Sequence, residues 1–330
     1  MCSACMADWK LLPLGIDVGS TRARIACAEA RREGGMRIRA IVARDIPDDA
    51  VSALRVDQPE LVAAVIEDML AEIGTRERRC VLAIGAPACA LRTLRFPKMS
   101  WPERLRAARF EAQRFAGWDL EEAGSIVRLH ALDRTAGTFA IGVTRAGSLD
   151  SRVRAARIAG LRAVAVDHDA FAIRRLLPDC DAIVDVGAER ATVHCFSATG
   201  PASLVAHMGG ATITRGIASE LSIDVPTAER RKRILGCAGA GVTASEEVVA
   251  AIAALIDRAR TRVSIEGIAV TGNGARLPNF ARALEEATGA VAGMPVPEVL
   301  HTAAYPEDVV RVAAPDWTLA ASLALWGAAA

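Results

Sequence analysis

Two aspartates occupy nearly the same surroundings, half the chain apart. IDVGSTRARIACAEA begins at Ile16, VDVGAERATVHCFSA begins at Val184, and seven of their fifteen positions are identical. The aspartates, Asp17 and Asp185, are 168 residues apart, and each follows an apolar run and precedes a glycine by two positions. Glycine allows the positive φ of a tight turn, and the backbone N–H groups of such a turn can hold an anion. Two facing carboxylates need a cation, and Mg²⁺ bound with nucleotide phosphates would satisfy both.

A glycine-rich turn later in the chain supports the same chemistry. AVTGNGARLPNF, which begins at Ala269, has the pattern of an apolar strand, a Gly-Asn-Gly turn and a helix. This arrangement lets the backbone approach a ligand closely at a helix N-terminus. Each turn alone is a common feature, but their order along one chain predicts a nucleotide cleft between two similar lobes.

The elements that must position these turns form two repeated units. Each unit opens with three strands in a meander, at 13–17, 22–30 and 36–43 in the first and at 182–185, 191–196 and 203–208 in the second. Residues 216–265 are predicted to be mostly helical, and Asp316 is predicted to be the N-cap of a final helix.

The pattern changes after residue 87. Residues 88–145 predict a small inserted α+β subdomain that contains an edge strand at Leu91–Phe96 and two further strands. Its helix follows SWPE, in which Ser100 is the N-cap and Glu103 the third helical residue, the pattern of a capping box.

Composition excludes several classes of function. The 330 residues are 52% hydrophobic and 24% charged with a net charge of +1, which is typical of a globular protein and does not favour a nucleic-acid partner. The chain opens without a signal-peptide pattern and has no apolar run of membrane-spanning length, so we expect no direct membrane insertion. Several of the eight cysteines lie in apolar runs, which indicates a reducing compartment, and the CxxC of Cys2 and Cys5 lacks the second pair that a zinc site needs.

These motifs, in this order, resemble those of the actin-like ATPase superfamily and, within it, the type IV pilus assembly protein PilM family. GIDVGST resembles the first phosphate motif, VDHDAFAIRRLL the first connecting motif, IVDVGAERATV the second phosphate motif, AVTGNGARLPNF the adenosine motif and TLAASLALWGAAA the second connecting helix. The inserted FPKMSWPERLRAARFEAQRFAGW resembles the lysine–methionine–helix signature of PilM proteins. The resemblance covers nearly the whole chain.

The resemblance implies an α/β architecture, the actin-like (ribonuclease H-like) duplicated two-lobed fold with an inserted small α+β subdomain. The implied boundaries are 1–87 with 146–180 for the first lobe (1A), 88–145 for the inserted subdomain (1C), 181–215 with 266–314 for the second lobe (2A), 216–265 for a helical subdomain (2B), and 315–330 for a helix that returns to the first lobe.

It also implies a site for ATP and Mg²⁺, with Asp17 and Asp185 at the metal. The residues expected to contact the nucleotide are Asp17, Gly19, Ser20, Thr21, Arg24, Asp185, Gly187, Gly209, Gly210, Glu229, Lys232, Gly272, Asn273, Gly274 and Arg276. Arg24 stands where relatives usually have a lysine, a change that keeps the charge. Asn273 replaces a usual glycine and could crowd the base, and Ala188 and Glu189 suit a phosphate turn less well than Ser or Thr, so we expect weak binding. From the residues alone, Glu229 and Lys232 also fit a surface ion pair three positions apart on a helix.

Hydrolysis would need a group that positions water, and Asp169 is the candidate. The connecting motif that contains it passes beneath the γ-phosphate in this superfamily. His168 is expected only to begin a helix. We therefore expect ATP binding with at most slow ATPase activity.

The resemblance also implies partners and a location. PilM proteins are cytoplasmic and bind the N-terminal cytoplasmic peptide of the inner-membrane protein PilN beside the inserted subdomain. We therefore expect a cytoplasmic scaffold, peripheral at the inner membrane through a PilN-like peptide and in contact with other pilus assembly proteins. A peptide added along Leu91–Phe96 is one hypothesis for the groove. A small-molecule kinase of the same superfamily and an FtsA-like filament-forming protein remain alternatives.

Overall fold

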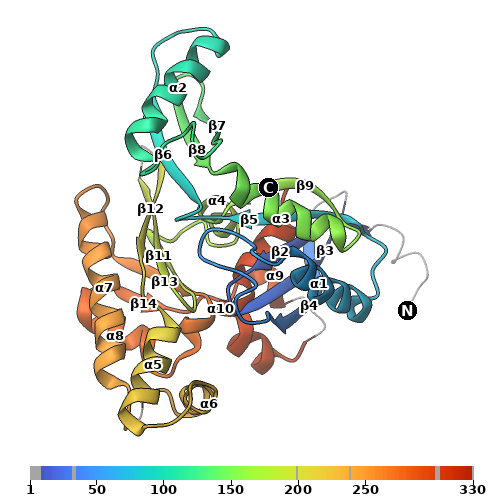
Figure 1. The fold of residues 1–330 in the computed structure, drawn as a ribbon. Helices are drawn as coiled ribbons and strands as arrows, with labels where there is room; N and C mark the ends of the chain where they lie inside the picture. The colour runs from blue at the N-terminus through green and yellow to red at the C-terminus, as the bar shows by residue number, and fades with distance from the viewer. Residues whose placement is uncertain (1–8, 32–34, 198–199, 238, 302–304, 329–330) are drawn as a thin grey trace.

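The computed structural model describes residues 9–31, 35–197, 200–237, 239–301 and 305–328, so Cys2 and Cys5 lie outside it. The chain forms two lobes, with a smaller subdomain that projects from them (Figure 1). Within the described residues, every helix is too short or too polar to cross a membrane.

The first lobe is built on a six-stranded sheet. Its strands are β1 (Trp9–Leu11), β2 (Leu14–Val18), β3 (Arg22–Arg31), β4 (Met36–Asp45), β5 (Arg79–Ile84) and β9 (Arg162–His168). β2, β3 and β4 form the predicted antiparallel meander, and β5 and β9 continue the sheet in parallel. The helices α1 (Pro59–Ile73) and α3 (Ala146–Ile158) cover one face, and α4 (Asp169–Leu176), α9 (Glu298–His301) and α10 (Glu307–Ala324) cover the other.

The second lobe repeats this strand order. The path β4-β3-β2-β5-β9 of the first lobe corresponds to β12-β11-β10-β13-β14 in the second, with the same parallel and antiparallel pairings. These strands are β10 (Ala182–Val186), β11 (Ala191–Ser197), β12 (Gly200–Ala206), β13 (Gly267–Thr271) and β14 (Val291–Gly293). Their outer face packs on α5 (Gly210–Leu221), α7 (Val242–Arg260) and α8 (Phe280–Thr288), and α6 (Val225–Leu235) packs on α5.

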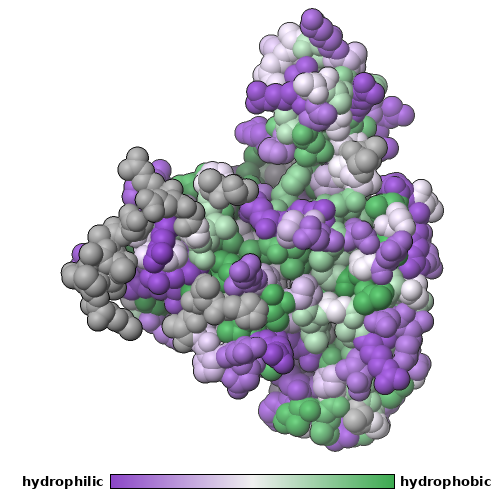
Figure 2. All heavy atoms as spheres, turned by 180° about the vertical axis from the view of Figure 1, so that it is seen from behind, coloured by the Kyte–Doolittle hydropathy of each residue, from purple (hydrophilic) through white to green (hydrophobic). Residues whose placement is uncertain are grey.

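The projecting subdomain is a three-stranded sheet with one helix. The strands β6 (Cys89–Arg95), β8 (Thr138–Thr144) and β7 (Ile126–Asp133) lie in that order, and α2 (Trp101–Phe115) packs on one face. The predicted capping box of α2 is confirmed, because the Glu103 carboxylate accepts from the Ser100 backbone N–H at 2.8 Å and the Ser100 hydroxyl accepts from the Glu103 N–H. Figure 2 shows a mainly hydrophilic outer end and hydrophobic residues around the base of this projection.

The helix α10 crosses from one lobe to the other. Only glycine fits at position 15 of β2, because a Cβ there would lie 2.1 Å from the carbonyl oxygen of Ala320. The predicted N-cap at Asp316 is wrong, since α10 begins at Glu307 and contains Pro315. Proline is normally unfavourable inside a helix, but α10 continues through Pro315, which is buried. The Pro315 carbonyl accepts a hydrogen bond from Gly272 N–H at 2.8 Å.

Candidate functional site

The two turns predicted from the repeat have the same geometry. Gly19 N–H donates to the carbonyl of Arg22 at 3.0 Å, and Gly187 N–H donates to the carbonyl of Arg190 at 2.9 Å. Neither glycine has a positive φ, so the prediction of that conformation is wrong. Space is tight at both glycines instead, because a Cβ would lie 3.1 Å and 3.2 Å from those two carbonyl oxygens, which would have to shift slightly to admit it.

Both turns open into one cleft between the lobes, which encloses about 1000 Å³ including space open to solvent. The predicted site residues that line it are Asp17, Gly19, Ser20, Thr21, Arg24, Asp169, Asp185, Gly187, Gly272 and Asn273. Six others lie outside this lining, namely Gly209, Gly210, Glu229, Lys232, Gly274 and Arg276. The structure thus brings the two aspartates to one cleft from opposite lobes.

The floor of the cleft holds a chain of opposite charges that links the lobes. Arg24 on β3 donates to Asp17 Oδ2 at 3.2 Å and also to the carboxylate of Asp316 on α10. The same carboxylate lies 3.6 Å from Arg276, which belongs to the 3₁₀ helix Asn273–Arg276 of the second lobe. Sequence reasoning missed Asp316 as a cleft residue, because its place depends on the path of α10 and no local pattern reports that path.

Burial changes the pKa values of the carboxyl groups in the cleft. It raises the pKa of Asp17, raises the pKa of Asp169 to about 7, and raises the pKa of Asp185 to about 6. Asp169 Oδ1 is buried without a hydrogen-bond partner among the described residues, and Asp185 has no ion pair there. A nearby cation would favour their charged forms, so the acids fit Mg²⁺. The described part of the chain holds no cluster of three potential metal ligands.

Asp169 lies at the end of β9, where α4 begins. His168 caps that helix as expected, because its Nδ1 accepts from Ala170 N–H at 3.1 Å. The carboxylate of Asp169 fits closely over Gly85, where an added Cβ would lie 1.9 Å from Oδ2. The position of this carboxylate is therefore fixed by the backbone at the end of β5.

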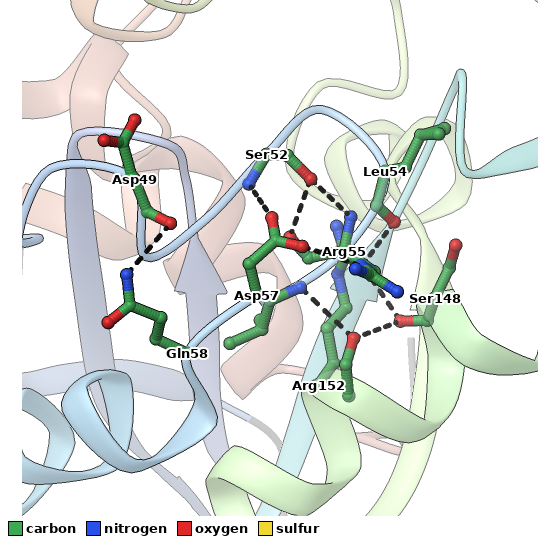
Figure 3. A network of polar contacts seen from close by, with 10 residues as sticks. Asp49, Ser52, Leu54, Arg55, Asp57, Gln58, Ser148 and Arg152 are labelled. Carbon is green, nitrogen blue, oxygen red and sulfur yellow. Dashed lines mark hydrogen bonds and ion pairs between the residues drawn. The ribbon is translucent and has the colours of Figure 1, made fainter.

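One wall of the cleft is the loop between β4 and α1, shown in Figure 3. Arg152 of α3 donates to the carbonyl of Leu54 at 3.1 Å, and within the loop Asp57 accepts from backbone and side-chain donors. Arg190 of the second lobe donates to the carbonyl of Ala53 at 3.3 Å. The loop is thus tied to both sides of the cleft. Neither Arg152 nor Arg190 was predicted as a site residue.

Glu229 and Lys232 form a buried brace. Lys232 Nζ donates to the carbonyl of Gly210 at 2.9 Å and to Thr214 Oγ1 at 2.7 Å, and it pairs with Glu229 at 2.6 Å. Burial lowers the pKa of Lys232. Gly210 N–H in turn donates to the carbonyl of Gly187 at 3.0 Å. The pair therefore holds the first turn of α5 against the second aspartate turn. The ion pair that the residues alone allowed is present, but Lys232 is buried and Glu229 is partly buried, so it is not a surface pair.

The glycine-rich turn after β13 packs directly on β10. Gly272 has φ +82°, and a Cβ on it would lie 2.3 Å from Asp185 Oδ1. A Cβ on Gly274 would lie 2.4 Å from the side chain of Val186. Both positions therefore require glycine, and Gly272 and Asn273 line the cleft whereas Gly274 does not.

Two buried histidines meet where the lobes join, a contact that was not predicted. The rings of His168 on β9 and His194 on β11 have centroids 6.4 Å apart, and neither Nε2 has a hydrogen-bond partner among the described residues. Burial lowers the pKa of His168 to about 4 and that of His194 to about 3. Both rings are therefore neutral at neutral pH.

Comparison with known proteins identifies the family. The family model for "Type IV pilus assembly protein PilM" matches residues 15–328. A chain in a solved PilM–PilN type IV pilus biogenesis complex is 24% identical, with 96% of this chain and 99% of that chain covered and a TM-score of 0.83.

More distant structures share the architecture. The ethanolamine utilization protein EutJ from Carboxydothermus hydrogenoformans is 14% identical over 96% of this chain and 90% of its own, with a TM-score of 0.62. The MamK double helical filament is 14% identical over 92% and 97%, with a TM-score of 0.50. The predicted actin-like two-lobed α/β fold is thereby confirmed. The match across residues 15–328 shows that this chain belongs to the type IV pilus assembly protein PilM family.

Proposed function

We propose that this chain is an ATP-binding scaffold of type IV pilus assembly that binds the N-terminal cytoplasmic peptide of a PilN-like inner-membrane protein. The observation that carries the nucleotide part is the pair of equivalent turns, Gly19–Arg22 and Gly187–Arg190, which open into one cleft. The protein would act in the cytoplasm, peripheral at the inner membrane through this peptide, with other pilus assembly proteins as further partners. The subdomain boundaries given above are part of the proposal.

In the cleft, the first turn with Ser20 and Thr21 would hold phosphates from one side and Gly187 from the other. Asp17 and Asp185 would hold Mg²⁺ through water, and the bound metal would neutralise phosphate charge. Glu229 and Lys232 would position α5, since they lie behind the lining.

Catalytic power should be low. Arg24 is already engaged by two carboxylates, which offset its charge and so weaken the attraction that it can offer a phosphate. Burial raises the pKa of Asp169, the candidate to hold a water molecule, to about 7, so its charged form depends on a nearby cation. We therefore propose a clasp in which ATP stabilises the closed lobes and hydrolysis is at most slow.

Thermal melting with and without Mg-ATP tests nucleotide binding. Binding to the native state must raise the midpoint, by the equivalent of about 2.7 kcal/mol at a ligand concentration of one hundred Kd. We expect the rise for the wild type and for Asp68→Ala, an exposed aspartate on α1, and no rise for Asp17→Ala. A wild type without any rise, or an equal rise in Asp17→Ala, would refute the assignment.

The PilN-like peptide would bind in an apolar groove. It lies between the face of the inserted sheet that α2 leaves uncovered and the first lobe, and its apolar lining includes Leu91, Ile126, Ala140, Val166, Phe171 and Trp326. Hydrophobic residues around the base of the projecting subdomain are visible in Figure 2. The earlier hypothesis of a peptide along Leu91–Phe96 uses the outer edge of β6 instead, which lies beside β12.

Fluorescence anisotropy with a labelled synthetic peptide, the N-terminal cytoplasmic segment of the PilN-like protein from the same organism, tests the groove. We expect Phe171→Ala to weaken binding at least tenfold, and Phe110→Ala, which removes a ring 71% exposed on α2, to leave it unchanged. A loss with Arg92→Glu but not with Phe171→Ala would favour the edge of β6.

A further inference from the structure

A second groove lies at the edge of the inserted subdomain, between β6 and β12. It encloses about 1750 Å³ including space open to solvent. Among the described strands, β6 pairs only with β8 and β12 pairs only with β11, so each has one edge without a pairing strand. Residues of both strands line the groove, which therefore joins the inserted subdomain to the second lobe.

The charged side chains that line this groove, in the part of the chain that the structure describes, are all arginines. Among the described residues, its lining contains Arg92 on β6, Arg145 at the start of α3, Arg258 in the last turn of α7 and Arg262 just after it, but no aspartate or glutamate. None of the four forms an ion pair with another residue that the structure describes. In the cleft between the lobes, by contrast, arginines and carboxylates balance one another.

Two of these arginines are held in place by aromatic rings. The guanidinium of Arg145 lies 4.3 Å from the ring centre of Trp118, and that of Arg92 lies 5.7 Å from the ring centre of Phe115. Such stacking fixes the guanidinium and leaves its N–H groups free to donate. Less side-chain entropy is then lost when a ligand binds.

An extended acidic peptide fits these features best. An unpaired strand edge offers main-chain hydrogen bonds to an extended chain, and a fixed guanidinium recognises a carboxylate through two parallel hydrogen bonds. The seven residues of β12 span roughly 23 Å at about 3.3 Å per residue, enough for a segment of similar length. We infer that this groove binds an acidic extended segment of a partner protein and thereby fastens the inserted subdomain to the second lobe.

We assign this partner to a different groove from the PilN-like peptide, since the apolar groove joins the inserted subdomain to the first lobe and, of the described residues, shares only Cys89 and Leu91 with the basic groove. The two proposals can therefore fail separately. Binding of the PilN-like peptide and stabilisation by Mg-ATP should be unchanged in variants of the basic groove, because Arg258 and Arg262 line neither of the other sites.

The probe is a fluorescein-labelled nonapeptide that alternates glutamate and valine, compared with the same peptide carrying glutamine in place of glutamate. Anisotropy measures its affinity for the full chain. We expect the double variant Arg258→Glu/Arg262→Glu to lower the affinity at least tenfold. Arg106→Glu/Arg109→Glu, with the same change of charge on exposed positions of α2, should lower it less than twofold. Arg92→Glu tests the opposite wall, and circular dichroism verifies that each variant is folded.

Five results would overturn the inference. The wild type fails to bind the glutamate peptide, or binds the glutamine peptide equally well. The two double variants lose affinity equally, which indicates unspecific attraction. The PilN-like peptide displaces the probe, which places both in one groove. A single-stranded oligonucleotide of equal charge binds more tightly and is displaced by the same variant, which assigns the groove to nucleic acid.

Discussion

Replacing Asp316 by alanine removes the carboxylate that joins Arg24 to Arg276. The side chains of Asp316 and Arg24 are only 2% and 7% exposed, so the variant leaves a buried guanidinium with Asp17 as its remaining partner. Removing one partner of a buried ion pair costs about 3–5 kcal/mol. The contact with Arg276, which is 35% exposed, adds no more than about 1 kcal/mol. We therefore expect the free energy of unfolding to fall by about 3–5 kcal/mol.

Urea unfolding followed by circular dichroism measures this loss, provided that the dependence on urea concentration is unchanged. Glu307→Ala is the matched control, because it lies on the same helix and its pair with Arg311 is more than 70% exposed on both sides, at 73% and 71%. That variant should lose less than about 1 kcal/mol. A similar small loss for Asp316→Ala would show that the buried network does not hold the lobes together.

A double-mutant cycle sharpens the test. Arg24→Ala/Asp316→Ala removes both members of the pair, so it should cost less than the two single variants added together. Asp316→Asn also relieves Arg24 of one competing carboxylate, and we expect a larger rise of the melting midpoint with Mg-ATP than in the wild type. An additive cycle together with an unchanged ATP response would contradict this role of Arg24.

Three further outcomes follow from the packing. Burial holds the pKa of His194 at about 3, against about 6.5 when unfolded, so the stability that its neutral ring provides is complete above pH 6.5 and is lost as the pH falls below it. Between pH 7 and pH 5, urea unfolding should show a loss about 2 kcal/mol larger in the wild type than in His194→Gln; equal losses would show that the ring is accessible to protons. Gly15→Ala should prevent α10 from docking on β2. A protease should therefore digest this variant under conditions in which the wild type and Gly293→Ala, where an added Cβ meets nothing, stay intact. Lys232→Met should remove the contact that braces α5 and should reduce the rise of the melting midpoint with Mg-ATP. Arg233, on the same helix, is 52% exposed, and Arg233→Met should leave that rise unchanged.

Much of this architecture was visible in the sequence because its signals are local. An apolar run, an aspartate and a glycine within a few residues were enough to locate both turns, and their repetition showed that the fold is duplicated. The capping box at Ser100 and Glu103 likewise lies within four residues. Short-range patterns of this kind depend little on where the rest of the chain goes.

The parts that were missed depend on contacts between distant segments. Asp316 enters the cleft only because α10 passes between the lobes, and Pro315 before it favoured a helix start that burial overrode. His194 and Arg190 acquire their roles from partners in the other lobe, for which no spacing rule exists. The two turn glycines were recognised, but for a positive φ that neither has, whereas the structure shows a carbonyl oxygen close to each of them.

The seat of α10 on the first lobe has a consequence for the order in which the chain folds. Ala26, Ala28 and Ile41 of the early strands find their buried neighbours in Ala320 and Ala321, which the ribosome adds almost three hundred residues later. Domains usually fold in the order of their synthesis. In this chain the earlier-made lobe must wait with one sheet face covered only by α4, while the second lobe already has its outer helices, so the first half of the protein is completed last.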